Sequence, residues 1–346
     1  MPRRLKRALP WILSLGILLF LLLTTDVAAI AAALESADWG RLVGFMALVT
    51  ALSFLVDAAT IVPLMRRFVL PLRYREVVAI KGVSYFLNVL NYSAAAAGMA
   101  WVIHKRHTRP GVPFMRVFSA LVWFFFVDII ALGIMLVVGW LLARDTIVAT
   151  PFYAQVPIVI AVVFAVVVGA LVYWNGRFDF VAFGFFRKWR LFQVFGEARL
   201  RDYAPLVAMR IGFICVYVLM HWLLLPAFGV HIPFWMLLMY SPLITFVQVI
   251  PANVSGLGAV QGVMVGLFAA HVAPDAGDPK AVIIAYSTVI GPLMTVMRLV
   301  IGYCFVATIA RDVLPNEADI DAVRQSEEGG AASEGSPTNA VGTNDT

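Results

Sequence analysis

Charged residues are scarce in this sequence, and their scarcity excludes an ordinary soluble protein. Asp, Glu, Lys and Arg make up 13% of the 346 residues, whereas hydrophobic residues make up 62%. Soluble domains carry roughly twice that proportion of charge. Because a helix satisfies its own backbone hydrogen bonds in lipid, we predict an all-α, polytopic integral membrane protein. The net charge of +6 suits contact with anionic headgroups, so we expect no nucleic-acid partner.

Cysteine is almost absent, and no catalytic or metal-binding set can be assembled from the residues present. The two cysteines, Cys215 and Cys304, lie in apolar runs, which argues against a disulfide framework or a cysteine-based metal site. The five histidines show no metal-ligand spacing. No Ser/His/Asp set or carboxylate pair is evident among the residues expected to be buried. We therefore expect no metal, no cofactor and no enzyme activity.

Long apolar runs are abundant, and six of them are long enough to cross a bilayer as helices. They lie at 10–33, 42–64, 114–142, 152–174, 204–228 and 281–309. A basic segment, 1–9, precedes the first run, for which a cleaved signal peptide is the less favoured interpretation. Lys and Arg concentrate in alternate loops, so the positive-inside rule places both termini in the cytoplasm, and we expect a bacterial inner membrane. The acidic tail, 312–346, has few apolar residues and is expected to be disordered.

Residues 82–103 form an apolar run whose two flanks are both strongly basic. A full crossing would put one basic cluster outside, against the positive-inside rule. We therefore predict a re-entrant hairpin with its tip at 91–98, alongside six full spans. The alternative is that this segment and the second broken segment, 232–272, both cross the membrane, which gives eight spans in all. The flanking residues are Arg75 and Lys81 before the run, and Lys105, Arg106 and Arg109 after it. The three that follow are also candidates for holding a lipid phosphate, with a purely topological role as the alternative.

A second broken segment, 232–272, has at its centre, in 248–261, a proline and two glycines within apolar sequence. Proline and mid-helix glycine interrupt a helix, and interrupted backbone at membrane depth is tolerated where protein or a water-filled cavity satisfies it. We expect the two breaks to line a substrate cavity or, alternatively, to satisfy only one another's backbone groups. The candidate residues are Asn88, Asn91, Ser93, Gly98, Gln248, Pro251, Asn253, Ser255, Gly256, Gly258 and Gln261.

The two broken segments occupy equivalent places in two halves of the chain. Residues 10–142 contain two spans, a hairpin and a span, and residues 152–311 repeat that order with every span reversed. Inverted halves with broken helices near the midplane are a recurrent transporter plan, in which the site lies between the repeats. We therefore predict an inverted repeat.

The two breaks also resemble a known family. Residues 88–106 and 251–261 are similar to the two signature stretches of the lysylphosphatidylglycerol synthase transmembrane-domain family, also called flippase-like membrane proteins. In the family, the first stretch carries an acid and an arginine where this chain has Met99 and Val102, and the second ends in a glutamate where this chain has Gln261. The resemblance implies a protein that moves or handles lipids or polyprenyl-linked substrates, and the missing charges imply a less charged ligand or a lost activity. We expect no soluble aminoacyl-transferase domain and hence no synthase activity.

Five ionisable residues fall inside the predicted spans, where such groups usually mark pathways or internal pairs. Asp128 and Arg298 lie at matching depths in equivalent spans and are predicted to pair; Asp57 and His221 form a second such pair. A purely structural ion pair or hydrogen bond is the alternative for each. Arg210 lies closer to the cytoplasmic end of its span, and we expect it to extend to the surface.

The connection at 175–203 mixes basic and aromatic residues, which is typical of a segment lying against anionic lipid, although an ordinary basic loop fits equally. The favoured function is that of a flippase-like transporter with a midplane cavity and a phosphate-bearing or polyprenyl-linked lipid as substrate. The alternative is a non-transporting accessory subunit that works with a protein partner in lipid or envelope biosynthesis. An enzyme that modifies a lipid headgroup is a third, less favoured possibility.

Overall fold

The computed structural model of the protein describes residues 26–88, 92–107, 111–147, 154–175, 184–249 and 259–313, and the structural statements below concern these ranges. They are almost entirely helical, which confirms the predicted all-α fold of a polytopic membrane protein. The predicted basic segment 1–9 and nearly all of the tail 312–346 lie outside the described residues.

Five helices in the described part of the chain are long and apolar enough to cross a membrane. They are α3 (Trp39–Phe68), α6 (Phe114–Ile147), α7 (Val156–Asn175), α10 (Leu200–Leu224), which continues as η2 (Leu225–Phe228), and α13 (Pro279–Val313). They match five of the six predicted spans. The sixth, 10–33, lies outside the described residues except where its end forms the start of α2 (Val27–Glu35).

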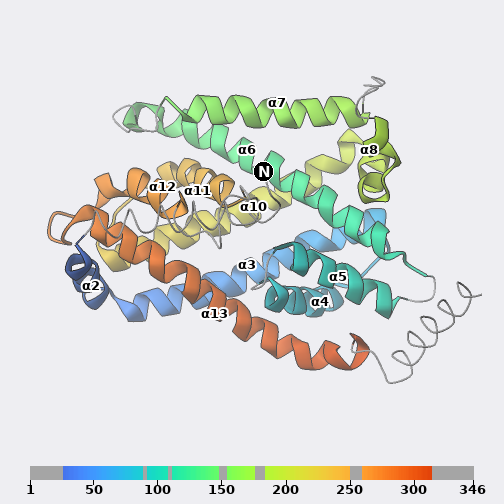
Figure 1. The fold of residues 1–346 in the computed structure, drawn as a ribbon, viewed down its shortest axis with the longest axis horizontal. Helices are drawn as coiled ribbons and strands as arrows, with labels where there is room; N and C mark the ends of the chain where they lie inside the picture. Colours follow the sequence, from blue (N-terminus) through green and yellow to red (C-terminus); the bar gives the residue numbers. More distant parts are fainter. Residues whose placement is uncertain are drawn as a thin grey trace, which may run out of the picture.

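Two pairs of shorter helices occupy the two predicted broken segments. The first pair is α4 (Tyr74–Leu87) and α5 (Tyr92–Arg106), and the second is α11 (Phe234–Val249) and α12 (Ala259–Phe268), which ends in η3 (Ala269–His271). Each helix is shorter than the roughly 20 residues needed to cross a bilayer. The helices of each pair pack against one another. In Figure 1 α4 and α5 occupy the end of the bundle where α3 finishes, and α11 and α12 occupy the opposite end.

The break in the first pair is narrower than its sequence indicates. The sequence predicts a tip at 91–98, but α5 already begins at Tyr92 and includes Gly98. The run of four alanines at 94–97 explains the difference, because alanine has the highest intrinsic helix propensity. Gly98 lies where a Cβ would overlap the side chain of Leu87, so it permits the close approach of α5 to α4.

The main contacts that helices of the first half make with the second half have counterparts made by the equivalent helices. In the first half α3, α4, α5 and α6 follow the same order as α10, α11, α12 and α13 in the second. α4 packs along α13, and correspondingly α11 packs along α6, while α3 and α10 pack on each other. Figure 1 shows α6 and α13 running in opposite directions, and likewise α3 and α10. This is the arrangement that an inverted repeat requires.

Glycines allow close backbone contact at two interfaces between the halves, that of α6 with α11 and that of α4 with α13. A Cβ on Gly139 of α6 would come within 2.4–2.7 Å of the backbone of Leu238 and Met239 in α11. A Cβ on Gly302 of α13 would come within 2.8–3.1 Å of Phe86 in α4. Close backbone approach at small residues is the usual basis of helix association in membranes.

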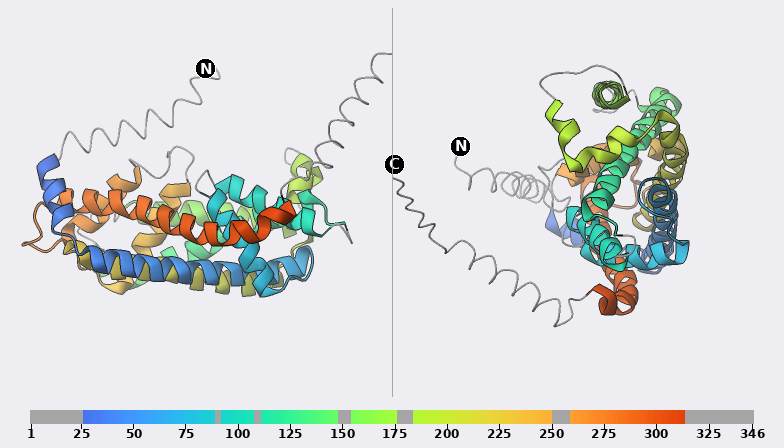
Figure 2. Two further views of the ribbon diagram at one scale, coloured as in Figure 1. Left: turned by 90° about the horizontal axis from the view of Figure 1, so that it is seen from below. Right: turned by 90° about the vertical axis from the view of Figure 1, so that its right-hand side faces the viewer.

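α7 lies at the periphery of the bundle. Figure 2 shows it outside the other helices when the molecule is turned to its end. Its main neighbour is α6, and of its apolar side chains only that of Val156 is buried, as expected of a helix that faces lipid. It leads into the connection that contains α8 (Gly184–Lys188), η1 (Arg190–Phe192) and α9 (Gln193–Glu197).

Candidate functional site: a buried charge network

Four charged side chains from four helices form one network in the interior of the bundle. Arg210 on α10 donates to Asp128 on α6 through Nε, and its Nη1 lies 2.8 Å from Oδ1 of Asp57 on α3. Nζ of Lys81 on α4 lies 2.8 Å from the second carboxylate oxygen of Asp57. The side chains of Arg210 and Asp57 are 5% and 11% exposed, so water contributes little to their solvation. Two acids thus balance two bases.

Aromatic rings enclose Arg210 in this position. Its guanidinium carbon lies 3.9 Å from the ring centroid of Phe213 and 4.8 Å from that of Phe124. Contacts of this kind are worth about 2 kcal/mol or more when they are desolvated. The rings therefore help to hold the guanidinium between the two carboxylates.

Arg298 on α13 lies next to this network but does not join its ion pairs. Its Nη2 donates to the hydroxyl of Tyr217 on α10 at 2.9 Å, and its guanidinium lies over the ring of Tyr85 on α4, 5.8 Å from the centroid. Nζ of Lys81 lies 6.0 Å from the centroid of the same ring. Tyr85 thus connects Arg298 to the network. Within the described residues no carboxylate lies at ion-pair distance from Arg298.

Both predicted ion pairs are wrong. Asp128 pairs with Arg210 instead of Arg298, and Asp57 pairs with Lys81 and Arg210 instead of His221. The repeat indicates the depth of each residue, but depth does not determine which faces of the helices meet. α6 packs on α10, so Asp128 meets the cation of α10.

The expected extension of Arg210 to the surface is also wrong. Arg210 is buried and pairs with two carboxylates inside the bundle. The sequence places Lys81 on a cytoplasmic flank, yet it is buried against Asp57. Acids inside a membrane span require a cation beside them. From Asp57 and Asp128, the sequence could therefore have indicated that Lys81 and Arg210 are buried partners.

His221 belongs to a separate cluster toward the end of α10. Its Nδ1 lies 2.7 Å from the hydroxyl of Tyr286 on α13, and both side chains are buried. The rings of Phe228 and Phe268 pack around this pair. The contact between His221 and Tyr286 links α10 to α13.

The described hairpin candidates occupy three different environments. Asn88 caps α4 with its backbone and is part-buried, whereas Gln248 is exposed near the end of α11. Gln261 is buried and donates to Oγ1 of Thr288 on α13 at 3.2 Å. The candidates Asn91, Pro251, Asn253, Ser255, Gly256 and Gly258, and the side chain of Ser93, lie outside the described residues.

Two of the three headgroup candidates lie at the end of α5. Lys105 and Arg106 are part-buried, and Nζ of Lys105 lies 5.1 Å from the ring centroid of Trp101. Arg109 lies outside the described residues.

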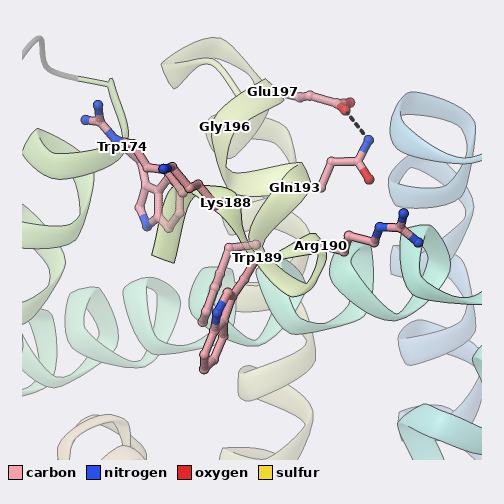
Figure 3. Close-up of a pocket in the computed structure, with 9 residues that line it drawn as sticks. Trp174, Lys188, Trp189, Arg190, Gln193, Gly196 and Glu197 are labelled. Carbon is pink, nitrogen blue, oxygen red and sulfur yellow. Dashed lines mark hydrogen bonds between the residues drawn. The ribbon is translucent and has the colours of Figure 1, made fainter. Parts of the chain in front are cut away.

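A basic and aromatic pocket of about 450 Å³ lies beside the end of α7. Figure 3 shows Trp174 and Trp189 among its walls and Gln193 donating to Glu197, a bond of 3.1 Å. Arg116 of α6 forms a two-bond pair with Glu197, and Ser119 of α6 accepts from the backbone of α9. The connection between α7 and α10 is therefore docked on α6. The pocket is lined by Trp174, Arg187, Lys188, Trp189, Arg190, Phe192, Gln193, Gly196 and Glu197.

Comparison with known proteins supports the resemblance noted in the sequence. The model of a protein family described as the lysylphosphatidylglycerol synthase TM region matches residues 8–302. This match covers the described spans, α13 as far as residue 302, together with both short-helix pairs and the charge network. A comparison with curated proteins finds no match.

Proposed function

The chain belongs to the lysylphosphatidylglycerol synthase TM region family, and from that premise we propose that it is a flippase-like transporter. Its substrate is a membrane lipid or polyprenyl-linked lipid with an anionic headgroup, carried between the leaflets by alternating access of two inverted halves. Transporters of this plan bind their substrate near the midplane, at the interface between repeats.

The observation that carries this proposal is the position of the charge network between the two halves. Arg210 comes from the second half, whereas Asp57 and Asp128 come from the first. When one half rocks against the other, these ion pairs separate or rearrange. A packed interface with two discrete arrangements is the kind of element that supports such a transition. The network therefore acts as a latch between the halves.

The network also supports an anionic substrate. Intramembrane charges are costly and usually face a pathway or one another. Asp57, Lys81, Asp128 and Arg210 balance, and Arg298 beside them adds a further positive charge. The interior is therefore suited to a negatively charged headgroup and unsuited to a cationic one.

Lipid movement in reconstituted vesicles tests the proposal. Vesicles with and without the protein carry a trace of fluorescently labelled phosphatidylglycerol, and dithionite added outside destroys only the label that it can reach. We expect the protein to expose inner-leaflet label. Asp128→Asn should alter the rate roughly tenfold, because losing a cross-half ion pair shifts the balance between conformations by about 1–3 kcal/mol.

Arg67→Gln is the matched control. Arg67 also forms a cross-half pair, with Asp202 at 2.9 Å, but its side chain is 45% exposed, so its loss should leave the rate nearly unchanged. Equal loss of label with and without the protein would rule out transport of this lipid. An unchanged rate in Asp128→Asn would show that the charge network does not act as a latch between the halves.

A non-transporting accessory subunit in lipid or envelope biosynthesis is the second candidate. Gln261 favours it, since Gln261 stands where the family stretch has a glutamate and its amide makes a hydrogen bond within the protein. In that case a protein partner should co-purify with the chain, and Asp128→Asn should leave the partner bound.

A further inference from the structure

We infer that Arg298, with Tyr217 beside it, forms a binding site for the phosphate group of a lipid. This inference rests on the proposed function, in that a lipid headgroup must enter the bundle to reach Arg298. It goes further by naming the residue that receives the headgroup and the chemical group received.

The first observation is the unbalanced charge of Arg298. Asp57 and Asp128 are both engaged by Lys81 and Arg210. A cation within a membrane span is expensive unless an anion neutralises it. No carboxylate in the described part of the chain lies within ion-pair distance of Arg298, so a bound anion would neutralise it.

The second observation is the hydrogen-bonding capacity that Arg298 retains. A guanidinium has five N–H donors, and Arg298 uses one of them on Tyr217. The side chain is part-buried, so its other donors remain reachable. Because the Tyr217 hydroxyl accepts from Arg298, its own proton is free to be donated to an oxyanion. Together they offer a two-donor fork plus a hydroxyl, which is the geometry that phosphate recognition favours.

The third observation is the level of Arg298 in the bundle. Gly302 of α13 contacts Phe86 of α4, and Figure 1 shows the two helices running in opposite directions. Arg298 precedes Gly302 by one helical turn, and Asn88 follows Phe86 at the end of α4. Arg298 therefore lies at the level of the end of α4, the first helix of the short pair.

Native mass spectrometry of the purified protein in a maltoside detergent tests the site with probes that differ only in the phosphate. The probes are dioleoyl phosphatidate, dioleoylglycerol and inorganic phosphate. We expect the wild type to retain phosphatidate and not dioleoylglycerol. Arg298→Gln should weaken the tightest phosphatidate site roughly tenfold to a hundredfold, because it removes charge-assisted hydrogen bonds. Tyr217→Phe should weaken it by a smaller factor.

Arg144→Gln is the matched control, since Arg144 is an exposed arginine near the end of α6 that lies 3.5 Å from Asp145. It should bind phosphatidate as the wild type does. Arg298→Lys retains the charge without the fork and should bind with intermediate strength, which also serves if Arg298→Gln fails to fold. The site would be overturned if Tyr217→Phe and either Arg298 variant, Arg298→Gln or Arg298→Lys, bound phosphatidate as tightly as the wild type. If inorganic phosphate were retained as well as phosphatidate, the assignment to a lipid would be overturned.

The two proposals can fail separately. If the Arg298 variants bind phosphatidate as the wild type does but the protein still moves lipid in vesicles, this inference is wrong and the transport proposal is retained. If phosphatidate binds at Arg298 but the protein moves no lipid, the site is retained and the transport proposal is wrong.

Discussion

Arg210 is the residue that ties three long helices together at the centre of the molecule. It bonds to α3 and α6 through two carboxylates, and its guanidinium is packed against the rings of Phe124 and Phe213. Among the described residues, its removal would leave Asp57 paired with Lys81 alone and Asp128 without an ion-pair partner. The cost of a buried ion pair is moderate while the pair is intact and becomes large when one partner is lost.

We therefore predict that Arg210→Met destabilises the protein by about 3–5 kcal/mol, the usual cost of breaking a buried pair. The measurement is the free energy of unfolding in mixed detergent micelles, with Arg67→Gln as the control. Because the Arg67 side chain is 45% exposed, that change should cost about 1 kcal/mol or less. Equal costs for the two variants would show that the network does not stabilise the fold.

At the residue scale, the sequence identifies most of the charged interior but not its pairing. Asp57, Asp128 and Arg298 stand out as charges in apolar runs, and all three lie in or beside the network. Their partners depend on how each helix is rotated and on which helix lies next to it. Those quantities follow from the packing of distant segments, such as α10 on α3 and α6, which periodicity within one helix does not reveal.

At the scale of the elements, glycine determines how closely the helices of the two halves meet. Gly139 faces the backbone of α11, whose position cannot adjust as a side chain would. A Cβ added to Gly169 on α7 would meet nothing within 4 Å, so Gly169 is a matched glycine at the lipid-facing periphery.

We predict that Gly139→Ala destabilises the protein by about 1–3 kcal/mol, because the added methyl group forces α6 and α11 apart. Gly169→Ala should be neutral or stabilising, since alanine favours the helix by about 1 kcal/mol over glycine. Thermal unfolding of both variants in one detergent checks this. A Gly139→Ala protein as stable as Gly169→Ala would contradict the close contact.

Five of the spans were predictable because each is a long apolar run, and length and hydropathy decide whether a helix can cross a bilayer. The sequence places the first break too broadly, because the small residues at 94–97 suggest a loop although alanine favours helix. The existence of an element was thus easier to predict than its bounds.

At the scale of the whole molecule, two halves of opposite orientation explain the fold and the proposed function together. Each half supplies a short-helix pair that packs on the long helix of the other, α4 on α13 and α11 on α6. The charge network lies where the halves meet. Broken helices and inverted repeats allow one site to open alternately to either side.

The most direct test of this architecture is the sidedness of both short-helix pairs in sealed membrane vesicles. Single cysteines replace the exposed residues Arg73 and Gly111, which flank α4 and α5, and His231 and Asp275, which flank α11 and α12. The background carries Cys215→Ser and Cys304→Ser. An impermeant maleimide should label the first two positions from the cytoplasmic side alone and the last two from the opposite side alone. Labelling of positions 73 and 111 from opposite sides would mean that the first segment crosses the membrane, and the inverted-repeat fold would be refuted.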